Sequence, residues 1–336
     1  MATAQQPELI PVTILTGFLG AGKTTLLNRI LTEQHGEKIA VIENEFGETG
    51  VDNDILLQDR DEQILEMNNG CICCTVRGDL VRILGDLAKK KKKGELKFDR
   101  VIIETTGLAN TGPVAQTFFM DEEIHGKYIL DAVVTVVDAK HGQQQLDIHE
   151  EAQVQVGFAD RLLLSKTDLV TDEEVKALQD RLKKMNPRAV QKRVNFGKAD
   201  IKDILDIRGF NLNSILEIEP DFLKEDHHEH NDDIKSFVWK DERPLSMEKI
   251  EMFLSLLVDT YGKDMLRYKG VLNIAGQDQR MIFQGVHMLM GGSPGKPWAP
   301  GEKRSSTMVF IGRNLPRRIF DEGLAYCVEG VEVPSA

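Results

Sequence analysis

The octapeptide Gly17-Phe-Leu-Gly-Ala-Gly-Lys-Thr24 constrains the fold of this chain more than any other segment. It fits the pattern G-x-x-x-x-G-K-[ST], and it lies between an apolar run, Ile10–Thr16, and a segment with helical periodicity, Thr24–Gln34. Between a strand and a helix this pattern is typical of a phosphate-binding loop, because its glycines let successive backbone N–H groups point at phosphate oxygens. The sequence therefore predicts a strand, a loop for a nucleotide's phosphates and a helix, in that order.

The side chains of this loop indicate how a nucleotide with Mg²⁺ is held. We expect Lys23 to reach the β- and γ-phosphates and the Thr24 hydroxyl to ligate Mg²⁺, so that both residues act in catalysis. The N-terminus of the following helix adds a favourable field for anions. The predicted nucleotide-binding residues of this segment are Gly17, Gly20, Ala21, Gly22, Lys23, Thr24 and Thr25.

Short apolar runs alternate with helical patterns through the first half of the chain. The runs are Lys38–Ile42, Arg100–Glu104, Ala132–Asp138 and Arg161–Ser165, and the clearest further helical patterns are Asp79–Lys89 and Glu173–Met185. Nearly continuous apolar runs are typical of strands that are buried on both faces. The alternation predicts an α/β domain with a mostly parallel sheet and helices on both faces.

The pattern changes after about residue 195, where the polar, acidic segment Asp221–Asp233 predicts a linker. Beyond it the segments predict a smaller α+β domain. Expected strands there are Ile234–Trp239, Gly270–Ala275, Arg280–Gln284 and Thr307–Gly312, and expected helices are one capped by Ser246 and one over Pro316–Tyr326. We expect a nucleotide-binding domain at 8–200, a connecting segment at 201–233 and a C-terminal domain at 234–330.

The run Ser165-Lys-Thr-Asp168, at the end of a predicted strand, indicates which base is bound. In an Asn-Lys-x-Asp motif the aspartate accepts hydrogen bonds from guanine N1–H and the exocyclic amine, and the lysine stem lies over the base. Adenine lacks those donors and would leave Asp168 unpaired. Serine in place of the first asparagine weakens a supporting contact but keeps the discriminating aspartate. We therefore expect GTP, bound through Ser165, Lys166 and Asp168.

Glu104-Thr-Thr-Gly107 follows another predicted strand and supplies further catalytic candidates. Glu104 suits binding of Mg²⁺ or work on the attacking water, and the Gly107 N–H suits contact with the γ-phosphate, through which it can sense hydrolysis. A solvated acidic turn is the alternative. The sequence offers no convincing glutamine to orient water and no evident arginine finger, so we predict slow intrinsic turnover.

Three of the four cysteines, Cys71, Cys73 and Cys74, lie within four residues. Soft thiolates favour Zn²⁺, Cu(I) or other thiophilic ions, and without a second C-x-x-C the site stays open, which suits a metal that is passed on. Small buried apolar side chains and a redox switch are the alternatives. Carboxylates of the segment Glu43–Glu48 can complete the site if that segment reaches both Mg²⁺ and the thiols, and otherwise they belong to a solvated turn.

A second group of metal-ligating side chains, His227, His228 and His230, lies in the predicted linker. Imidazoles bind Zn²⁺, but a flexible segment preorganises a site poorly. A solvated linker is the favoured interpretation, and a low-affinity arm that acquires metal is the alternative.

Charge and composition exclude several classes of protein. The chain has 42 Lys and Arg against 54 Asp and Glu, a net charge of −12, which argues against broad binding to nucleic acid or to an anionic membrane. No apolar run approaches the roughly 20 residues of a membrane helix, and the first residues lack the basic and apolar stretches of a signal peptide. Clustered cysteines make a poor disulfide framework, so we expect a cytoplasmic protein.

Together these motifs resemble those of the CobW-type metallochaperone GTPases, and most closely the YjiA-like branch. Similar motifs in the same order are Gly17–Thr24, Glu43–Gly47, Gly70–Cys74, Glu104–Gly107 and Ser165–Asp168, and later stretches similar to the C-terminal domain are Tyr268–Gly270 and Met308–Leu315. The Cys-x-Cys-Cys spacing is the most specific of them. The resemblance implies a Mg²⁺- and GTP-dependent protein that binds Zn²⁺ or Co²⁺ and delivers the metal to a client protein.

On this resemblance Cys71, Cys73 and Cys74 are the metal ligands, with Glu43 and Glu48 as candidate partners. We hypothesise that the metal is loaded in the GTP state and released to a client metalloprotein after hydrolysis. One alternative is a metal- or redox-sensing regulatory GTPase that binds a partner without delivering metal. Another is an ATP-using kinase or transferase with an incidental cysteine segment. The sequence leaves open a homo-oligomer and does not identify the client.

Overall fold

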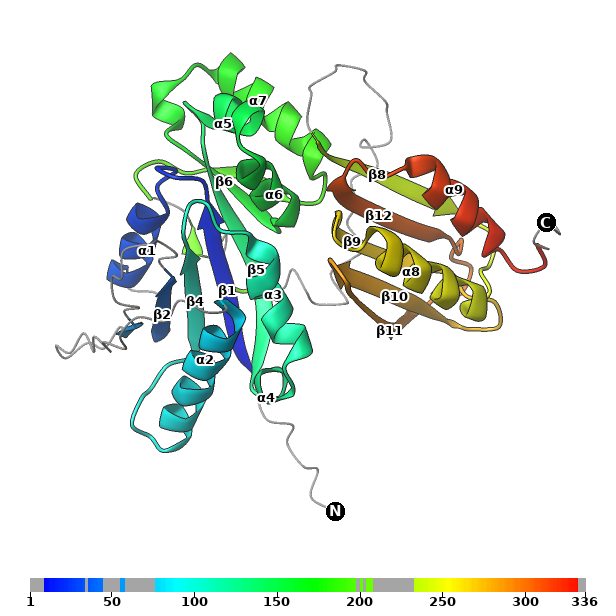
Figure 1. The fold of residues 1–336 in the computed structure, drawn as a ribbon, viewed down its shortest axis with the longest axis horizontal. Helices are drawn as coiled ribbons and strands as arrows, with labels where there is room; N and C mark the ends of the chain where they lie inside the picture. Colours follow the sequence, from blue (N-terminus) through cyan, green and yellow to red (C-terminus); the bar gives the residue numbers. More distant parts are fainter. Residues whose placement is uncertain are drawn as a thin grey trace. The chain divides into compact units, whose positions relative to one another are not determined.

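The computed structural model describes residues 9–33, 36–44, 55–57, 76–197, 200–201, 204–207 and 233–331. The chain forms two compact units (Figure 1). The first comprises Met1–Gln179 and Ala189–Phe210, and the second Asp180–Arg188 and Asn211–Ala336.

The first unit contains a seven-stranded sheet in the order β3-β2-β4-β1-β5-β6-β7. Its strands are β1 (Ile10–Gly17), β2 (Ile39–Asn44), β3 (Ile55–Leu57), β4 (Arg100–Thr105), β5 (Tyr128–Asp138), β6 (Arg161–Ser165) and β7 (Val190–Arg193). All pairs are parallel except that of β3 with β2. Every residue of β4 is buried, as expected for a strand covered on both faces.

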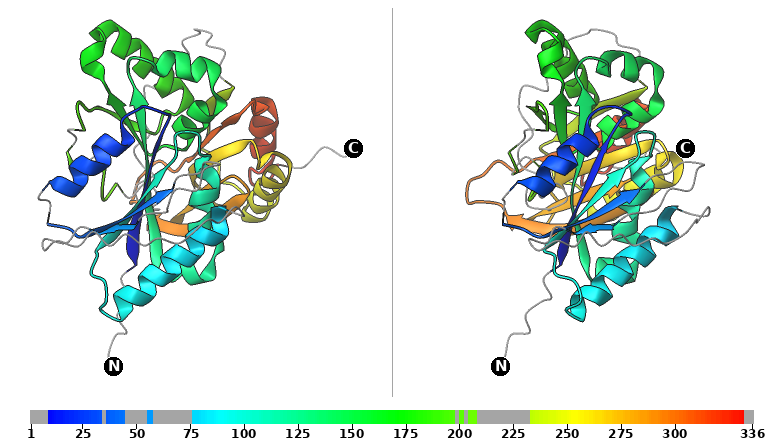
Figure 2. Two further views of the ribbon diagram at one scale, coloured as in Figure 1. Left: turned by 60° about the vertical axis from the view of Figure 1, so that its left-hand side comes forward. Right: turned by 90° about the vertical axis from the view of Figure 1, so that its left-hand side faces the viewer.

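Helices cover both faces of this sheet (Figure 2), which confirms the predicted α/β architecture. They are α1 (Lys23–Thr32), α2 (Val76–Lys92), α3 (Thr111–Met120), α4 (Glu122–His125), α5 (Gly142–Ile148), α6 (Glu150–Phe158) and α7 (Asp172–Met185), with a 3₁₀ turn, η1 (Thr167–Leu169). On one face Leu26, Leu27 and Ile30 of α1 pack into a core cluster with strand residues. On the other face α3 and α6 pack against β5.

Several parts of this sheet differ from the sequence prediction, among them β3, which was not predicted. β5 begins at Tyr128, earlier than the expected Ala132, because the acidic residue that interrupts its apolar run is accommodated. Asp131 is buried, accepts a hydrogen bond from Thr13 Oγ1 at 3.4 Å and lies 3.8 Å from Arg100 Nη1. β7 was not expected, since it is a partly exposed edge strand in which only Val190 is apolar.

The second unit contains a five-stranded antiparallel sheet in the order β11-β10-β9-β12-β8. Its elements are β8 (Ile234–Asp241), α8 (Met247–Tyr261), β9 (Met265–Leu272), β10 (Gln279–Val286), β11 (Leu289–Pro297), β12 (Ser306–Arg313) and α9 (Arg317–Tyr326). Side chains of α8 and α9 share one core cluster with four of the strands. The predicted smaller α+β domain is therefore confirmed.

Strand boundaries in the second unit differ from the prediction where charge or glycine interrupts the apolar pattern. β9 spans Met265–Leu272 rather than Gly270–Ala275, because Arg267 and Lys269 are buried within the strand. β11 was not expected, since its sequence contains three glycines and two prolines. Gly285 in β10 leaves room for the ring of Tyr268 in the neighbouring strand. A Cβ atom at position 285 would lie 1.9 Å from Tyr268 Cζ.

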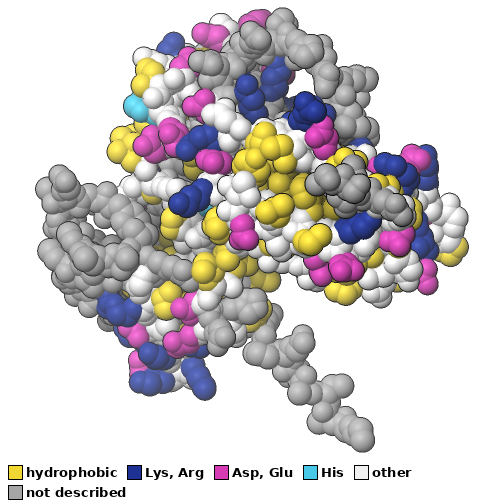
Figure 3. Space-filling model, turned by 45° about the vertical axis from the view of Figure 1, so that its right-hand side comes forward, with side chains coloured by type: hydrophobic (Ala, Val, Ile, Leu, Met, Phe, Trp, Pro, Cys, Tyr) yellow, Lys and Arg dark blue, Asp and Glu magenta, His cyan; other side chains and the backbone are white. Residues whose placement is uncertain are grey.

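On the face of the described residues drawn in Figure 3, basic and acidic groups lie next to one another and no broad basic region is visible. Among the described helices none is long and apolar enough to cross a bilayer.

Aromatic packing forms the centre of the second unit. The ring of Phe310 in β12 lies 4.9 Å from that of Phe320, 5.3 Å from that of Phe237 and 6.4 Å from that of Tyr268, measured between centroids. Such pairs stabilise a core beyond the area that they bury. Truncation of Phe310 would remove one partner from three contacts at once.

We predict that Phe310→Ala lowers the free energy of unfolding of the second unit by about 3–5 kcal/mol. Both tryptophans, Trp239 and Trp298, lie in this unit, so urea denaturation followed by tryptophan fluorescence measures it selectively. Met252→Ala is the matched control, because the Met252 side chain on α8 is 69% exposed. Equal midpoints for the two variants would contradict the prediction.

Candidate functional site

The predicted phosphate-binding loop joins the carboxyl end of β1 to the N-terminus of α1. Three of its residues have positive φ angles: 143° at Gly17, 73° at Gly20 and 100° at Gly22. Glycine adopts this region without strain, whereas other residues rarely do. At Gly17 a Cβ atom would also lie 2.3 Å from the carbonyl oxygen of Val136 in β5. The glycine spacing is thus required by the backbone that turns the loop towards a ligand.

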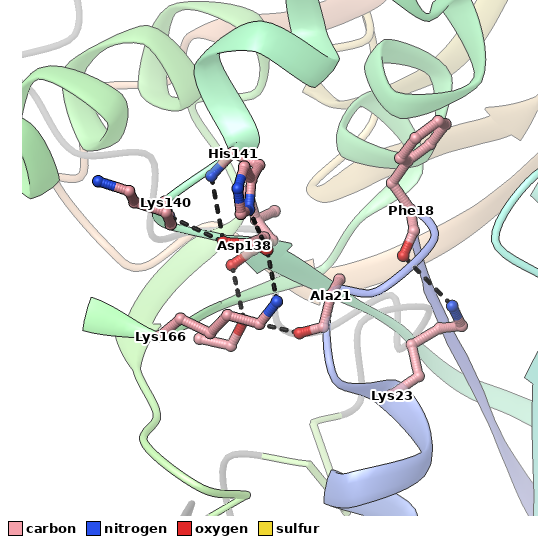
Figure 4. Close-up of polar contacts among 9 residues, drawn as sticks. Phe18, Ala21, Lys23, Asp138, Lys140, His141 and Lys166 are labelled. Carbon is pink, nitrogen blue, oxygen red and sulfur yellow. Dashed lines mark hydrogen bonds and ion pairs between the residues drawn. The ribbon is translucent and has the colours of Figure 1, made fainter. Parts of the chain in front are cut away.

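Lys23, the first residue of α1, is buried beside this loop (Figure 4). Its ammonium donates a hydrogen bond to the carbonyl oxygen of Phe18 at 3.4 Å. Burial lowers the pKa of Lys23, and the negative charge of Glu104 partly opposes that effect. A buried cation with one long hydrogen bond is well suited to an anionic ligand, which would restore the lost solvation.

Thr24 and Glu104 lie together at the edge of the sheet where β1 and β4 end. Thr24 Oγ1 donates a hydrogen bond to Glu104 Oε1 at 3.0 Å, and Glu104 is largely buried. The parallel pairing of β1 and β4, with Leu15 opposite Glu104, produces this proximity. The two residues proposed for Mg²⁺ thus place a hydroxyl and a carboxylate oxygen side by side, which fits a hard divalent cation.

The segment after β4 packs directly against the phosphate-binding loop. Gly107 is buried, and a Cβ atom there would lie 2.6 Å from the backbone nitrogen of Leu19. Only glycine therefore fits this position without a shift of the loop. Gln155 of α6, which is 1% exposed, donates hydrogen bonds through Nε2 to the carbonyl oxygens of Gly107 at 3.0 Å and Ala109 at 3.2 Å.

No sequence pattern indicated Gln155 or the packing of the start of α6 against the phosphate-binding loop. The ring of Phe18 stacks on that of His149, the residue before α6, with centroids 4.5 Å apart. Glutamine in a helix carries no sequence signal for such a role, because its partners lie more than forty residues away.

The predicted base-binding segment begins at the end of β6. Ser165 Oγ donates a hydrogen bond to the carbonyl oxygen of Ala21 at 2.6 Å, so the serine does make a contact with the phosphate-binding loop. Lys166 has a left-handed backbone with φ 55°. Asp168 lies in η1 with an exposed side chain, as a base-binding carboxylate requires. The structure thus brings the two predicted parts of the nucleotide site together.

Most of the residues predicted to bind a transition metal lie outside the described part of the chain. Cys71, Cys73, Cys74 and Glu48 lie outside the described residues, as do His227, His228 and His230. The backbone of Glu43 lies in β2 opposite Glu104 in β4. Within the described part of the chain no group of three or more His, Cys, Asp or Glu residues is arranged to hold a metal ion.

Comparison with known proteins gives the affiliation of both units. The family model for the CobW/HypB/UreG nucleotide-binding domain matches residues 11–192, and the model for the C-terminal domain of cobalamin synthesis protein cobW matches residues 234–328. The chain belongs to the CobW/HypB/UreG family. The resemblance inferred from the motifs is therefore confirmed.

Individual relatives of this family match over nearly the full length. The zinc chaperone YjiA of Escherichia coli K12 is 45% identical over 310 residues, which cover 91% of this chain and 95% of that protein. Zinc-regulated GTPase metalloprotein activator 1 of Schizosaccharomyces pombe is 33% identical over 92% of this chain and 83% of its own length. The crystal structure of the Zn(II)-bound YjiA GTPase from E. coli matches with a TM-score of 0.79 and 39% identity, covering 96% of this chain and all of that chain.

We predict that Gln155→Leu loosens the segment around Gly107. The two carbonyl oxygens would lose their common donor, at a cost of about 1 kcal/mol per hydrogen bond. Hydrogen exchange of the Ala109 amide, which donates to Thr106 O, should accelerate by roughly tenfold. Gln145→Leu is the control. Gln145, Gln155 and Phe18 line one small cavity, but Gln145 has no described side-chain hydrogen bond to the Gly107 segment. Unchanged exchange in Gln155→Leu would contradict the prediction.

Proposed function

We propose that this protein is a GTP-hydrolysing metal chaperone, which binds Zn²⁺ or Co²⁺ through Cys71, Cys73 and Cys74 and delivers it to a client metalloprotein. One observation carries the proposal. β2 ends at Asn44, beside the nucleotide site, and α2 begins at Val76, so the chain that holds the cysteines starts at the nucleotide site. Two of the relatives are a zinc chaperone and a zinc-regulated GTPase metalloprotein activator, which supports the same function.

In this proposal the described residues bind and orient the triphosphate. Lys23 and the N-terminal amides of α1 neutralise and hold the phosphates. Thr24 and Glu104 would hold Mg²⁺, which would supply positive charge to the phosphates. The Gly107 N–H contacts the γ-phosphate and responds to its loss.

Slow turnover follows from the same arrangement. The Gln155 amide is engaged by the Gly107 and Ala109 carbonyl oxygens, so it is not available to orient the attacking water. In this proposal the bound nucleotide distinguishes a GTP state from a GDP state of the protein. Binding of a client or a metal then sets the rate of GTP hydrolysis.

We predict that Asp168→Asn exchanges the base preference from guanine to xanthine. Loss of the carboxylate removes charge-assisted hydrogen bonds to guanine N1–H and its amino group, which lowers GTP affinity roughly 10- to 100-fold. The new amide N–H can instead donate to the 2-oxo group of xanthine. Isothermal titration with GTP, XTP and ATP measures all three affinities. Unchanged GTP affinity, or a preference of the wild type for ATP, would contradict guanine recognition by Asp168.

We predict that Zn²⁺ binds at least about fivefold more tightly with a GTP analogue and Mg²⁺ than with GDP, which is within the usual range of allosteric coupling. Competition with a chromophoric zinc chelator measures the affinity in both states. Serine at all three of Cys71, Cys73 and Cys74 should abolish both the binding and the difference. Equal affinities in the two nucleotide states would eliminate the coupling.

The chain offers a matched thiol control in Cys327. Burial in the core of the second unit raises the pKa of the Cys327 thiol to about 11. It therefore stays protonated at neutral pH and is a poor metal ligand. Cys327→Ala should leave zinc affinity unchanged in both nucleotide states. Separately, if zinc affinity depends on the nucleotide but no zinc is transferred to a client, the sensing regulator is favoured over the chaperone.

A further inference from the structure

We infer that Asp138 is a positioning residue of the base-binding site, which acts by fixing the side chain of Lys166. This inference rests on the proposed guanine-nucleotide function. Asp138 is the last residue of β5, and it is 1% exposed. None of the sequence motifs includes it, since it lies between the Glu104–Gly107 and Ser165–Asp168 segments in the chain.

The Asp138 carboxylate accepts four hydrogen bonds, two on each oxygen (Figure 4). Oδ1 accepts from the backbone N–H of Lys140 at 2.8 Å and of His141 at 3.1 Å. Oδ2 lies 2.7 Å from Lys166 Nζ and 3.0 Å from His141 Nδ1. A carboxylate has about four lone-pair sites, so this group is saturated and held rigidly.

The carboxylate is anionic at neutral pH despite its burial. Burial alone raises the pKa of Asp138, but hydrogen bonds from the side chains of Lys166 and His141 and from the backbone of His141 and Lys140 outweigh it, and the pKa lies below its usual value. A fixed buried anion is a specific anchor for one cation. Lys166, whose side chain is 35% exposed, is that cation.

Lys166 needs such an anchor because its stem is long and flexible. A lysine side chain loses rotamer entropy when it is held in one place. If the base itself had to fix the side chain, this entropic cost would lower the affinity for the nucleotide. The pair with Asp138 holds the stem in place before the nucleotide arrives. The backbone is braced at the same point, because the Ala139 N–H donates to Ser165 O at 2.9 Å. The ends of β5 and β6 therefore present Lys166 as a preformed surface for the base.

If Asp138 had only a structural role, nucleotide affinity would not depend on its negative charge. The two bonds to Oδ1 close the turn that leads into α5, and that turn needs only a neutral acceptor. Asp138→Asn can keep this acceptor, since its amide oxygen can replace Oδ1. The substitution replaces Oδ2 by an N–H₂ group, which cannot accept a hydrogen bond from Lys166. It therefore separates the positioning role from the turn.

The test measures binding of GTP, GDP and inorganic tripolyphosphate to the full chain by isothermal titration with Mg²⁺. We expect Asp138→Asn to lower the affinities for GTP and GDP by the same factor, about tenfold. It should also raise KM for GTP more than it changes kcat, because the lost interaction is equally strong in the ground state and the transition state. Tripolyphosphate lacks the base, so its affinity should not change. Equal loss of tripolyphosphate affinity would show a general defect of the site and overturn the inference.

A double-mutant cycle shows whether the effect passes through Lys166. In a Lys166→Met background Asp138→Asn should cause no further loss of GTP affinity, whereas additive losses would overturn the inference. Asp160→Asn is the matched control, because Asp160 Oδ2 accepts from the Val133 N–H of the same strand at 2.9 Å, away from the site. It should leave GTP affinity unchanged.

The outcomes for the inference and for the proposed function are distinguishable. A wild-type chain that binds tripolyphosphate but shows no preference for GTP over ATP would overturn guanine recognition, and the positioning role with it. Wild-type binding of GTP that Asp138→Asn leaves unchanged would overturn the positioning role alone.

Discussion

Parallel pairing of β1 with β4 and β5 is the constraint on which the whole nucleotide site depends. In parallel strands the carboxyl ends meet at one edge of the sheet, and ligands bind outside that edge. Here the pairing places the loop after β1, the Glu104 carboxylate of β4 and the Asp138 carboxylate of β5 at the same edge. β6 adds Ser165 next to Asp138. Residues that are more than one hundred positions apart in the chain meet there because the strands run in the same direction.

Charge at this edge is arranged in two separate pairs. Lys23 with Glu104 lies at the phosphate end, and Lys166 with Asp138 lies at the base end. At the phosphate end Lys23 Nζ donates a 3.4 Å hydrogen bond to the Phe18 carbonyl oxygen and feels the negative charge of Glu104, so a polyanion can recruit it. The pair at the base end is tight, with a 2.7 Å contact, and it holds the lysine side chain that we expect to lie over the uncharged base. In the proposed site one lysine is thus available for charge neutralisation, and the other is held in place for packing against the base.

Local sequence patterns predicted the loop and the strand ends that form this site, but not the buried polar residues that hold them in place. The phosphate-binding loop, β1, β6 and the segment of Glu104 carry signals within a few consecutive residues, because glycine geometry and buried parallel strands restrict residue type locally. Gln155, Asp138 and the buried Asp131 carry none. Their roles arise from partners far along the chain, and a single glutamine or aspartate is compatible with many surroundings. The glycine- and proline-rich β11 was missed for a related reason, since its pairing with β10 overrides the propensity of its residues.

The coupling of metal and nucleotide can be argued from the two fixed ends of the cysteine-bearing chain. β2 pairs with β4 up to Asn44 opposite Thr105, directly before the segment that carries Gly107. The Tyr128 hydroxyl donates to the carbonyl oxygen of Leu84 in α2 at 2.8 Å, so α2, which begins at Val76, is held to β5. Both ends of the cysteine-bearing segment are therefore held to the nucleotide unit. Because linkage is reciprocal, a nucleotide that strengthens metal binding must itself be bound more strongly by the metal-loaded protein.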